Sequence, residues 1–68
     1  MLDLKKLQTF KVTVDKGSFS AAAEKLNYSP STVSKHIAEL KEEIGEPLIK
    51  EDTLSKGLTE VGMLTYNY

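Results

Sequence analysis

Residues 17–47 read GSFSAAAEKLNYSPSTVSKHIAELKEEIGEP and predict two helices joined by a tight turn. The first glycine of this stretch can end a helix without steric cost, and Ser18 is a favoured N-cap for a short helix that runs to about Leu26. After a two-residue connection, Ser29 is the next N-cap candidate. Pro30 suits the first position of a second helix, because an N–H group there would have no partner within the helix.

The second helix of this pair is predicted over residues 30–44, since Gly45 ends it, and its two sides differ. Apolar side chains at i, i+4, i+7 and i+11 form one narrow stripe for packing: Val33, Ile37, Leu40 and Ile44. The opposite side and its flanks carry small, polar or charged residues: Ser31, Thr32, Ser34, Lys35, Ala38 and Glu42. Such a helix buries one face and leaves short side chains accessible near its N-terminal end.

The flanking segments complete one small domain. Residues 4–15 predict a helix whose buried face is built from apolar residues three and four apart: Leu4, Leu7, Phe10 and Val14. Residues 48–50 and 57–59 are predicted to be the strands of a hairpin around the polar loop 51–56. Thr59 is an N-cap candidate for a last helix, with apolar positions three and seven apart: Val61, Leu64 and Tyr68.

The composition fits one domain and excludes several kinds of site. The 68 residues are 40% hydrophobic and 28% charged, and they include no cysteine and one histidine. Without cysteine there is no disulfide, thiolate nucleophile or cysteine-ligated metal, and one histidine excludes an all-imidazole metal site within one chain. No nucleophile with a base, no paired acids on a rigid scaffold and no phosphate loop is identifiable. We therefore predict no enzymatic activity and no cofactor.

Hydropathy and charge bear on location and partners. The longest apolar run is Ala21–Ala23, far short of the ~20 residues that cross a bilayer, and no apolar stretch follows the first lysines as in a secretory signal. We expect a cytoplasmic protein without a membrane segment. Nine lysines against ten acidic residues give a net charge of −1, which argues against a protein that coats nucleic acid. Any DNA binding must depend on local placement of charge.

Two helices joined by a short turn and followed by a hairpin describe a winged helix-turn-helix. In residue order the chain also resembles, over essentially its whole length, the N-terminal DNA-binding domain of LysR-type transcriptional regulators. The matching residues are Leu7-Gln8-Thr9-Phe10, Gly17-Ser18-Phe19-Ser20, Ala22-Ala23-Glu24-Lys25-Leu26, Ser29, Val33-Ser34-Lys35-His36-Ile37, Leu40, Gly45-Glu46-Pro47-Leu48 and Leu58-Thr59-Glu60-Val61-Gly62. The resemblance implies a mainly α fold with a three-helix core, a short β-hairpin wing and the start of a linker helix. Residues 1–58 would form the DNA-binding domain, and residues 59–68 would begin the linker or dimerisation helix.

The resemblance further implies that the start of helix 30–44 enters the major groove of double-stranded DNA, while the hairpin touches the flanking backbone or minor groove. Helix N-termini carry partial positive charge that suits a phosphate, and short hydroxyl side chains beside a cation can approach base edges. The predicted DNA contacts are Ser18, Ser29, Pro30, Ser31, Thr32, Ser34, Lys35, Lys50 and Lys56. In the alternative interpretation the two N-cap serines only cap their helices, and the other polar residues near this end are a solvated face.

The chain departs from the family pattern at positions that bear on DNA binding. Pro30 replaces the usual glutamine, Lys35 replaces arginine, and the chain has no arginine at all. In the hairpin, Ile49 and Glu51 stand where phenylalanine and arginine are usual, and acidic residues there would repel phosphate unless they point away. Because Lys41 replaces a usual glutamate, we hypothesise a charge-reversed ion pair between Lys41 and Glu51 that joins the third helix to the hairpin. Two unrelated surface charges are the alternative.

The last helix and the charge balance bear on assembly. In the family this helix is a long linker that pairs with its counterpart in a second subunit and leads to an effector-binding domain. Val61, Leu64 and Tyr68 have no obvious partner within the chain, so we predict a weak homodimer through this stripe. An effector ligand is expected only if a further C-terminal domain exists. The sequence is compatible both with a truncated domain and with a natural short protein.

The alternative function is a winged-helix protein-interaction module with weak or lost DNA binding that pairs with a full-length relative. The acidic balance and the absence of arginine would favour this alternative.

Other polar and aromatic residues of the two central helices are interpreted structurally. Glu39, Glu42 and Glu43 are expected to form a solvated face. His36 lies off the core stripe and is expected to be a boundary or phosphate-adjacent residue, not a ligand or base. Tyr28 is expected to pack over the turn that precedes helix 30–44.

Overall fold

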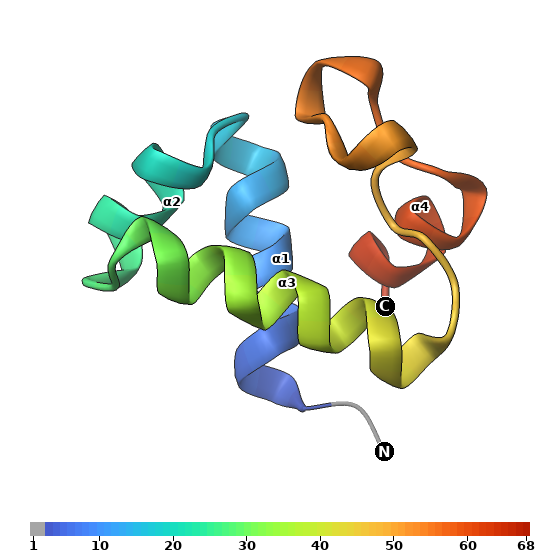
Figure 1. The fold of residues 1–68 in the computed structure, drawn as a ribbon, viewed down its shortest axis with the longest axis horizontal. Coiled ribbons are helices and arrows are strands. Elements are labelled where there is room, and N and C mark those ends of the chain that lie inside the picture. The colour runs from blue at the N-terminus through green and yellow to red at the C-terminus, as the bar shows by residue number, and fades with distance from the viewer. Residues whose placement is uncertain (1–2) are drawn as a thin grey trace.

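The helices follow the order that the sequence predicts. They are α1 (Leu4–Lys16), α2 (Phe19–Leu26), α3 (Pro30–Ile44) and α4 (Glu60–Tyr66), with a wing of residues 48–58 between α3 and α4 (Figure 1). This computed structural model describes residues 3–68; residues 1 and 2, which begin the predicted domain 1–58, lie outside the described part. The longest helix has 15 residues, and within residues 3–68 no helix is long and apolar enough to cross a bilayer.

Side-chain caps fix where these helices begin. The carboxylate of Asp3 accepts the N–H of Lys5 at 2.8 Å at the start of α1. The three predicted caps are confirmed, since the hydroxyls of Ser18, Ser29 and Thr59 accept the N–H groups of Ala21, Thr32 and Gly62 at 3.2, 3.2 and 2.9 Å. Each bond satisfies an N–H that the helix itself leaves free, so the boundary depends on residues within one turn.

The core lies between α1, α2 and α3, and the start of the wing closes one side of it. Phe10, Val33 and Leu40 are fully buried, and burying a side chain of this size stabilises the fold by roughly 1.5–3 kcal/mol. The predicted stripe of α3 is confirmed, with Ile44 half-buried at its end. The buried apolar residues of the described chain are Leu7, Phe10, Ala22, Ala23, Val33, Ile37, Leu40, Leu48 and Ile49.

The buried face of α1 differs from the predicted one. Leu4 is 74% exposed, so its predicted place in the core is wrong, whereas Thr9 and Thr13 are buried. The hydroxyl of Thr9 donates to the carbonyl of Lys5 at 2.9 Å, and the hydroxyl of Thr13 donates to the carbonyl of Thr9 at 2.7 Å. Because this bond satisfies the hydroxyl, threonine can be buried in a helix, and an apolar pattern alone cannot identify such a face.

The wing is more compact than the predicted hairpin. In place of strands 48–50 and 57–59, one antiparallel bridge joins Ile49 and Leu58. The loop folds into two 3₁₀ turns, Lys50–Asp52 and Leu54–Lys56. Glu51 and Asp52 adopt the left-handed conformation, with φ of 52° and 56°, and reverse the chain directly after the bridge, so neither strand can continue.

Helix α4 packs against α1 and ends earlier than the predicted stripe requires. The hydroxyl of Tyr66 donates to the carboxylate of Asp15, and this hydrogen bond raises the pKa of Tyr66. Val61 is half-buried against the core, which corrects the prediction that it lacks a partner within the chain. Tyr68 lies beyond the last helical residue and is 77% exposed, as Leu64 is at 68%. The predicted stripe of Val61, Leu64 and Tyr68 therefore does not form a single apolar face of α4.

Candidate nucleic-acid interface

The N-terminal end of α3 is exposed and presents five residues that we call the α3 tip: Ser29, Pro30, Ser31, Ser34 and Lys35. The hydroxyl oxygen of Ser29 lies 3.0 Å from that of Ser31 and 2.9 Å from that of Thr32, which is half-buried behind the tip. Figure 1 shows the start of α3 beside α2, well separated from the wing and α4, drawn in orange and red. Within residues 3–68, neither the wing nor α4 covers the α3 tip.

The other predicted contacts lie on two further elements. Ser18 is half-buried at the start of α2, where it caps that helix. Lys50 and Lys56 are exposed on the wing, one in each 3₁₀ turn. In the described part of the chain the ammonium groups of Lys35, Lys50 and Lys56 form no ion pair, whereas Lys6 and Lys41 do. All three lysines of the predicted contact set are therefore available to an external anion.

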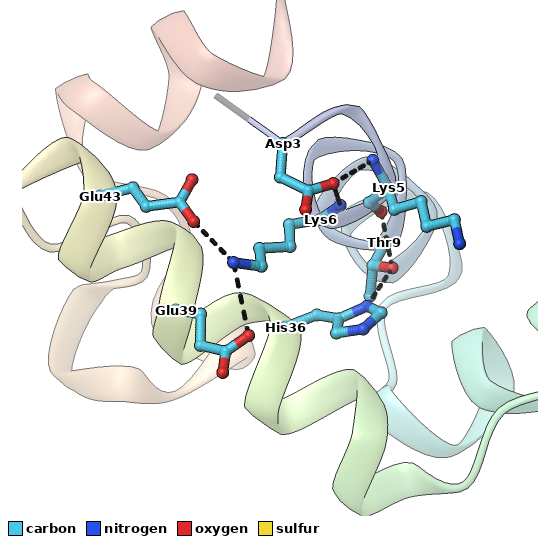
Figure 2. A network of polar contacts seen from close by, with 7 residues as sticks. All are labelled: Asp3, Lys5, Lys6, Thr9, His36, Glu39 and Glu43. Atoms are coloured by element: carbon cyan, nitrogen blue, oxygen red, sulfur yellow. Dashed lines mark hydrogen bonds and ion pairs between the residues drawn. The ribbon is translucent and has the colours of Figure 1, made fainter. Parts of the chain in front are cut away.

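Two acidic side chains of α3 face α1, and Figure 2 shows them converging on Lys6. The Nζ atom of Lys6 lies 2.6 Å from Oε2 of Glu43 and 3.4 Å from Oε1 of Glu39. The hydrogen bond between Lys6 and Glu43 raises the pKa of the lysine and lowers the pKa of the glutamate. Glu42 and Glu43 are exposed as predicted, whereas Glu39 is half-buried, and the sequence did not predict that Lys6 pairs with Glu39 and Glu43. Lys6 of α1 therefore offsets the negative charge of Glu39 and Glu43, which lie in the half of α3 remote from the tip.

His36 fixes the first half of α3 against α1. Its Nδ1 lies 2.9 Å from the hydroxyl oxygen of Thr9 (Figure 2), and its ring meets Tyr28 edge-on at a centroid distance of 5.2 Å. Because the Thr9 hydroxyl donates its one proton to the carbonyl of Lys5, the hydrogen-bond network assigns the proton on Nδ1 to the histidine, which donates it. The prediction of a boundary histidine is confirmed, since His36 is half-buried, and Tyr28 packs against the core and the ring of His36.

An ion pair joins α3 to the wing, but the predicted partner is wrong. The Nζ atom of Lys41 lies 3.5 Å from Oδ1 of Asp52, and in the described chain Lys41 forms no ion pair with Glu51. The left-handed backbone at both acidic residues decides which carboxylate faces α3, and a sequence pattern does not reveal that conformation.

A groove of about 240 Å³ lies between one side of α3, the wing and the start of α2. Ser34, Ala38, Lys41 and the buried Ile37 line it from α3, and Ile49 and Asp52 line it from the wing. Lys41 is not among the DNA contacts predicted from the sequence. Its position seven residues after Ser34, close to two helical turns, is the signal that could have placed it on the same face.

Residues 4–63 match the family described as bacterial regulatory helix-turn-helix proteins of the lysR family. The chain belongs to the LysR family. The HTH-type transcriptional activator AaeR of Escherichia coli (strain K12) is 40% identical to it over 63 residues, which are 93% of this chain and 20% of AaeR. The HTH-type transcriptional regulator IlvY of the same strain is 38% identical over 61 residues, 90% of this chain and 20% of IlvY. This LysR-type chain thus spans about a fifth of the length of the curated relatives it matches.

Solved structures support the same assignment. The DNA-binding domain of BenM, crystallised in complex with catB site 1 DNA, matches with a TM-score of 0.88 and 31% identity over 98% of this chain and 72% of that one. Full-length BenM carrying the R156H mutation matches with a TM-score of 0.88 over 22% of its length. The predicted mainly α winged helix-turn-helix is confirmed, and the chain is a LysR-type helix-turn-helix DNA-binding domain.

Proposed function

We propose that this domain binds double-stranded DNA in a sequence-dependent manner to regulate transcription, with the start of α3 in the major groove. The observation that carries the proposal is the exposed α3 tip, whose short side chains and single cation are left free by the rest of the fold. Small side chains permit close approach to base edges, and sequence is read there. The similarity to BenM, which was crystallised with DNA, supports this docking. A regulator of this kind would act in the cytoplasm.

Each predicted contact has a role in this arrangement. The hydroxyls of Ser31, Thr32 and Ser34 would donate to base edges or phosphates. The ring of Pro30 would pack against the same part of the DNA. Ser18 and Ser29 begin helices whose free N–H groups and partial positive charge favour a phosphate. Lys35 would add a point charge at the tip, while Lys50 and Lys56 would contact the flanking backbone from the wing.

Selection from a random duplex library, followed by fluorescence anisotropy at several salt concentrations, tests the proposal. We expect a preferred sequence and a steep loss of affinity with salt, because cations on the protein displace counterions from phosphates. Lys35→Ala should weaken binding and make the logarithmic salt slope shallower by about 0.9, the contribution of one phosphate. Lys5→Ala is the matched control, since Lys5 is an exposed lysine of the first turn of α1. Binding that responds to Lys5 and not to Lys35 would contradict the docking.

A protein-interaction role is the second candidate function, and the wing favours it. Glu51 and Asp52 are both exposed where a winged helix approaches the DNA backbone, and they would repel phosphates. In this alternative the domain pairs with a full-length relative and has little affinity for DNA. Absence of duplex binding at the lowest salt concentration of the same titration would favour this role.

We also infer that the domain forms a weak homodimer through the exposed apolar residues at its C-terminal end. Met63, Leu64 and Tyr68 are 56%, 68% and 77% exposed and follow one another closely in the chain. Large apolar residues exposed in one short segment favour burial against a second copy. A dimer would read paired half-sites about one helical turn apart, because protein symmetry sets their spacing.

A further inference from the structure

Lys41 extends the proposed DNA-facing side of α3 beyond the α3 tip. It follows Ser34 by seven residues, which at 100° per residue returns the side chain to almost the same direction. Ser34, Ala38 and Lys41 line one groove, so the alignment holds for the side chains as well as for the backbone. The rise of a helix places Lys41 roughly 10 Å from Ser34 along the axis.

This distance compares closely with the dimensions of DNA. The major groove is about 12 Å wide, and phosphate strands form its two rims. If Ser31 and Ser34 approach base edges, a residue roughly 10 Å further along the same face lies near a rim. The wing borders the other side of the groove that Lys41 lines, so the phosphate strand between the major groove and the wing would pass over this groove.

The ammonium group of Lys41 already holds an anion in the free protein. Oδ1 of Asp52 lies 3.5 Å from its Nζ, and the two side chains are 41% and 78% exposed. An exposed ion pair of this kind is weak, so another anion can replace the carboxylate readily. A phosphate oxygen is an acceptor of the same kind and carries the charge that a lysine binds in DNA complexes.

We propose that Lys41 is a DNA-phosphate contact of this domain and that the Asp52 carboxylate pairs with the Lys41 ammonium group until DNA binds. The duplex then exchanges the Asp52 carboxylate for a backbone phosphate, and the released carboxylate turns toward solvent. Asp52 is thereby an internal competitor that lowers affinity for DNA. This inference rests on the proposed docking of α3 in the major groove.

Anisotropy titrations of five proteins with a mixed-sequence duplex of about 30 base pairs, roughly three helical turns, test the proposal. The proteins are the wild type, Lys41→Gln, Asp52→Asn, the double variant with both changes, and Glu51→Gln as control. Glu51→Gln removes the same charge from the neighbouring wing residue without releasing a lysine. Circular dichroism of each protein verifies that these surface changes leave the fold intact.

Lys41→Gln should weaken binding and make the salt slope shallower by about 0.9, the contribution of one phosphate. Asp52→Asn should tighten binding several-fold, and by more than Glu51→Gln does. In the Lys41→Gln background, Asp52→Asn should increase DNA affinity only as much as Glu51→Gln does, because no ammonium group remains to be released.

Two outcomes overturn the inference and leave the proposed function in place. The first is a salt slope that Lys35→Ala alters and Lys41→Gln does not. The second is a change in DNA affinity on Asp52→Asn that is equal in the wild type and in Lys41→Gln. Failure of the wild type to bind the duplex at the lowest salt concentration overturns the proposed function and this inference together. The Lys35→Ala measurement therefore distinguishes the two failures.

Discussion

A Cβ atom placed on Gly62 would lie 2.0 Å from the carbonyl oxygen of Leu48. The same carbonyl accepts the N–H of Thr59 at 3.1 Å, and the Thr59 hydroxyl donates to the carbonyl of Pro47 at 2.6 Å. Helix α4 therefore rests with its first turn directly on the backbone that leads into the wing. The absence of a side chain at Gly62 allows this close approach.

Gly62→Ala should destabilise the domain by about 2–4 kcal/mol, because the added methyl group meets backbone that cannot move without breaking these bonds. Thermal unfolding followed by circular dichroism measures the loss. Met63→Ala is the matched control in the same helix at about 5 μM protein, where the proposed weak dimer is dissociated, since Met63 is exposed in the monomer and its truncation should then change stability by less than about 0.5 kcal/mol. Equal stabilities of the two variants would contradict the steric argument.

The helix boundaries could be predicted because a cap is a contact within one turn. Ser18, Ser29 and Thr59 each satisfy the N–H three residues ahead, and no distant part of the chain is needed. The core stripe of α3 follows equally from local spacing. The α3 tip was predicted for the same reason, since its exposure is the consequence of burying the opposite face.

The features that could not be predicted from the sequence depend on contacts between distant residues. Lys6 and Glu43 are 37 residues apart, and only the packing of α1 on α3 brings them together. The partner of Lys41 depends on left-handed backbone at Glu51 and Asp52, which acidic residues adopt uncommonly. A short polar loop has no periodicity from which such a turn could be deduced.

The two buried threonines of α1 should respond differently to valine. The Thr13 hydroxyl bonds only the Thr9 carbonyl in the described structure, so Thr13→Val should change the free energy of unfolding by less than about 1 kcal/mol. Thr9→Val also removes the acceptor of His36 Nδ1 and should cost more, about 1–3 kcal/mol. Urea unfolding of both variants provides the comparison, and a larger loss for Thr13→Val would refute the assigned role of Thr9.

The ion pair between Lys6 and Glu43 should make stability depend on pH at both extremes. The hydrogen bond from Lys6 lowers the pKa of Glu43 below its ordinary value of 4.5, so its contribution is present above that value and is lost as the pH falls through the lowered pKa. The same bond raises the pKa of Lys6 above 10.5, so the contribution of the lysine is present below that value and is lost at more alkaline pH.

Glu43→Gln should therefore lower the melting temperature at neutral pH and have no effect once acid protonates Glu43 in the wild type. Melting curves over a pH series show whether the difference disappears on the acidic side. Glu42→Gln is the control, because Glu42 is exposed and forms no ion pair in the described chain. A difference that persists unchanged in acid would show that the variant acts through packing.

Leu64→Glu should abolish the proposed dimer. In a two-fold dimer the same patch meets itself, so one substitution places two like charges in the interface. Sedimentation at about 100 μM, a concentration that populates an interaction of roughly −6 kcal/mol, should show self-association for the wild type and a monomer for the variant. Ser55→Glu introduces the same charge on the exposed wing and should leave association unchanged. A wild type that sediments as a monomer at this concentration would remove the basis for the dimer, and with it the expectation of paired half-sites.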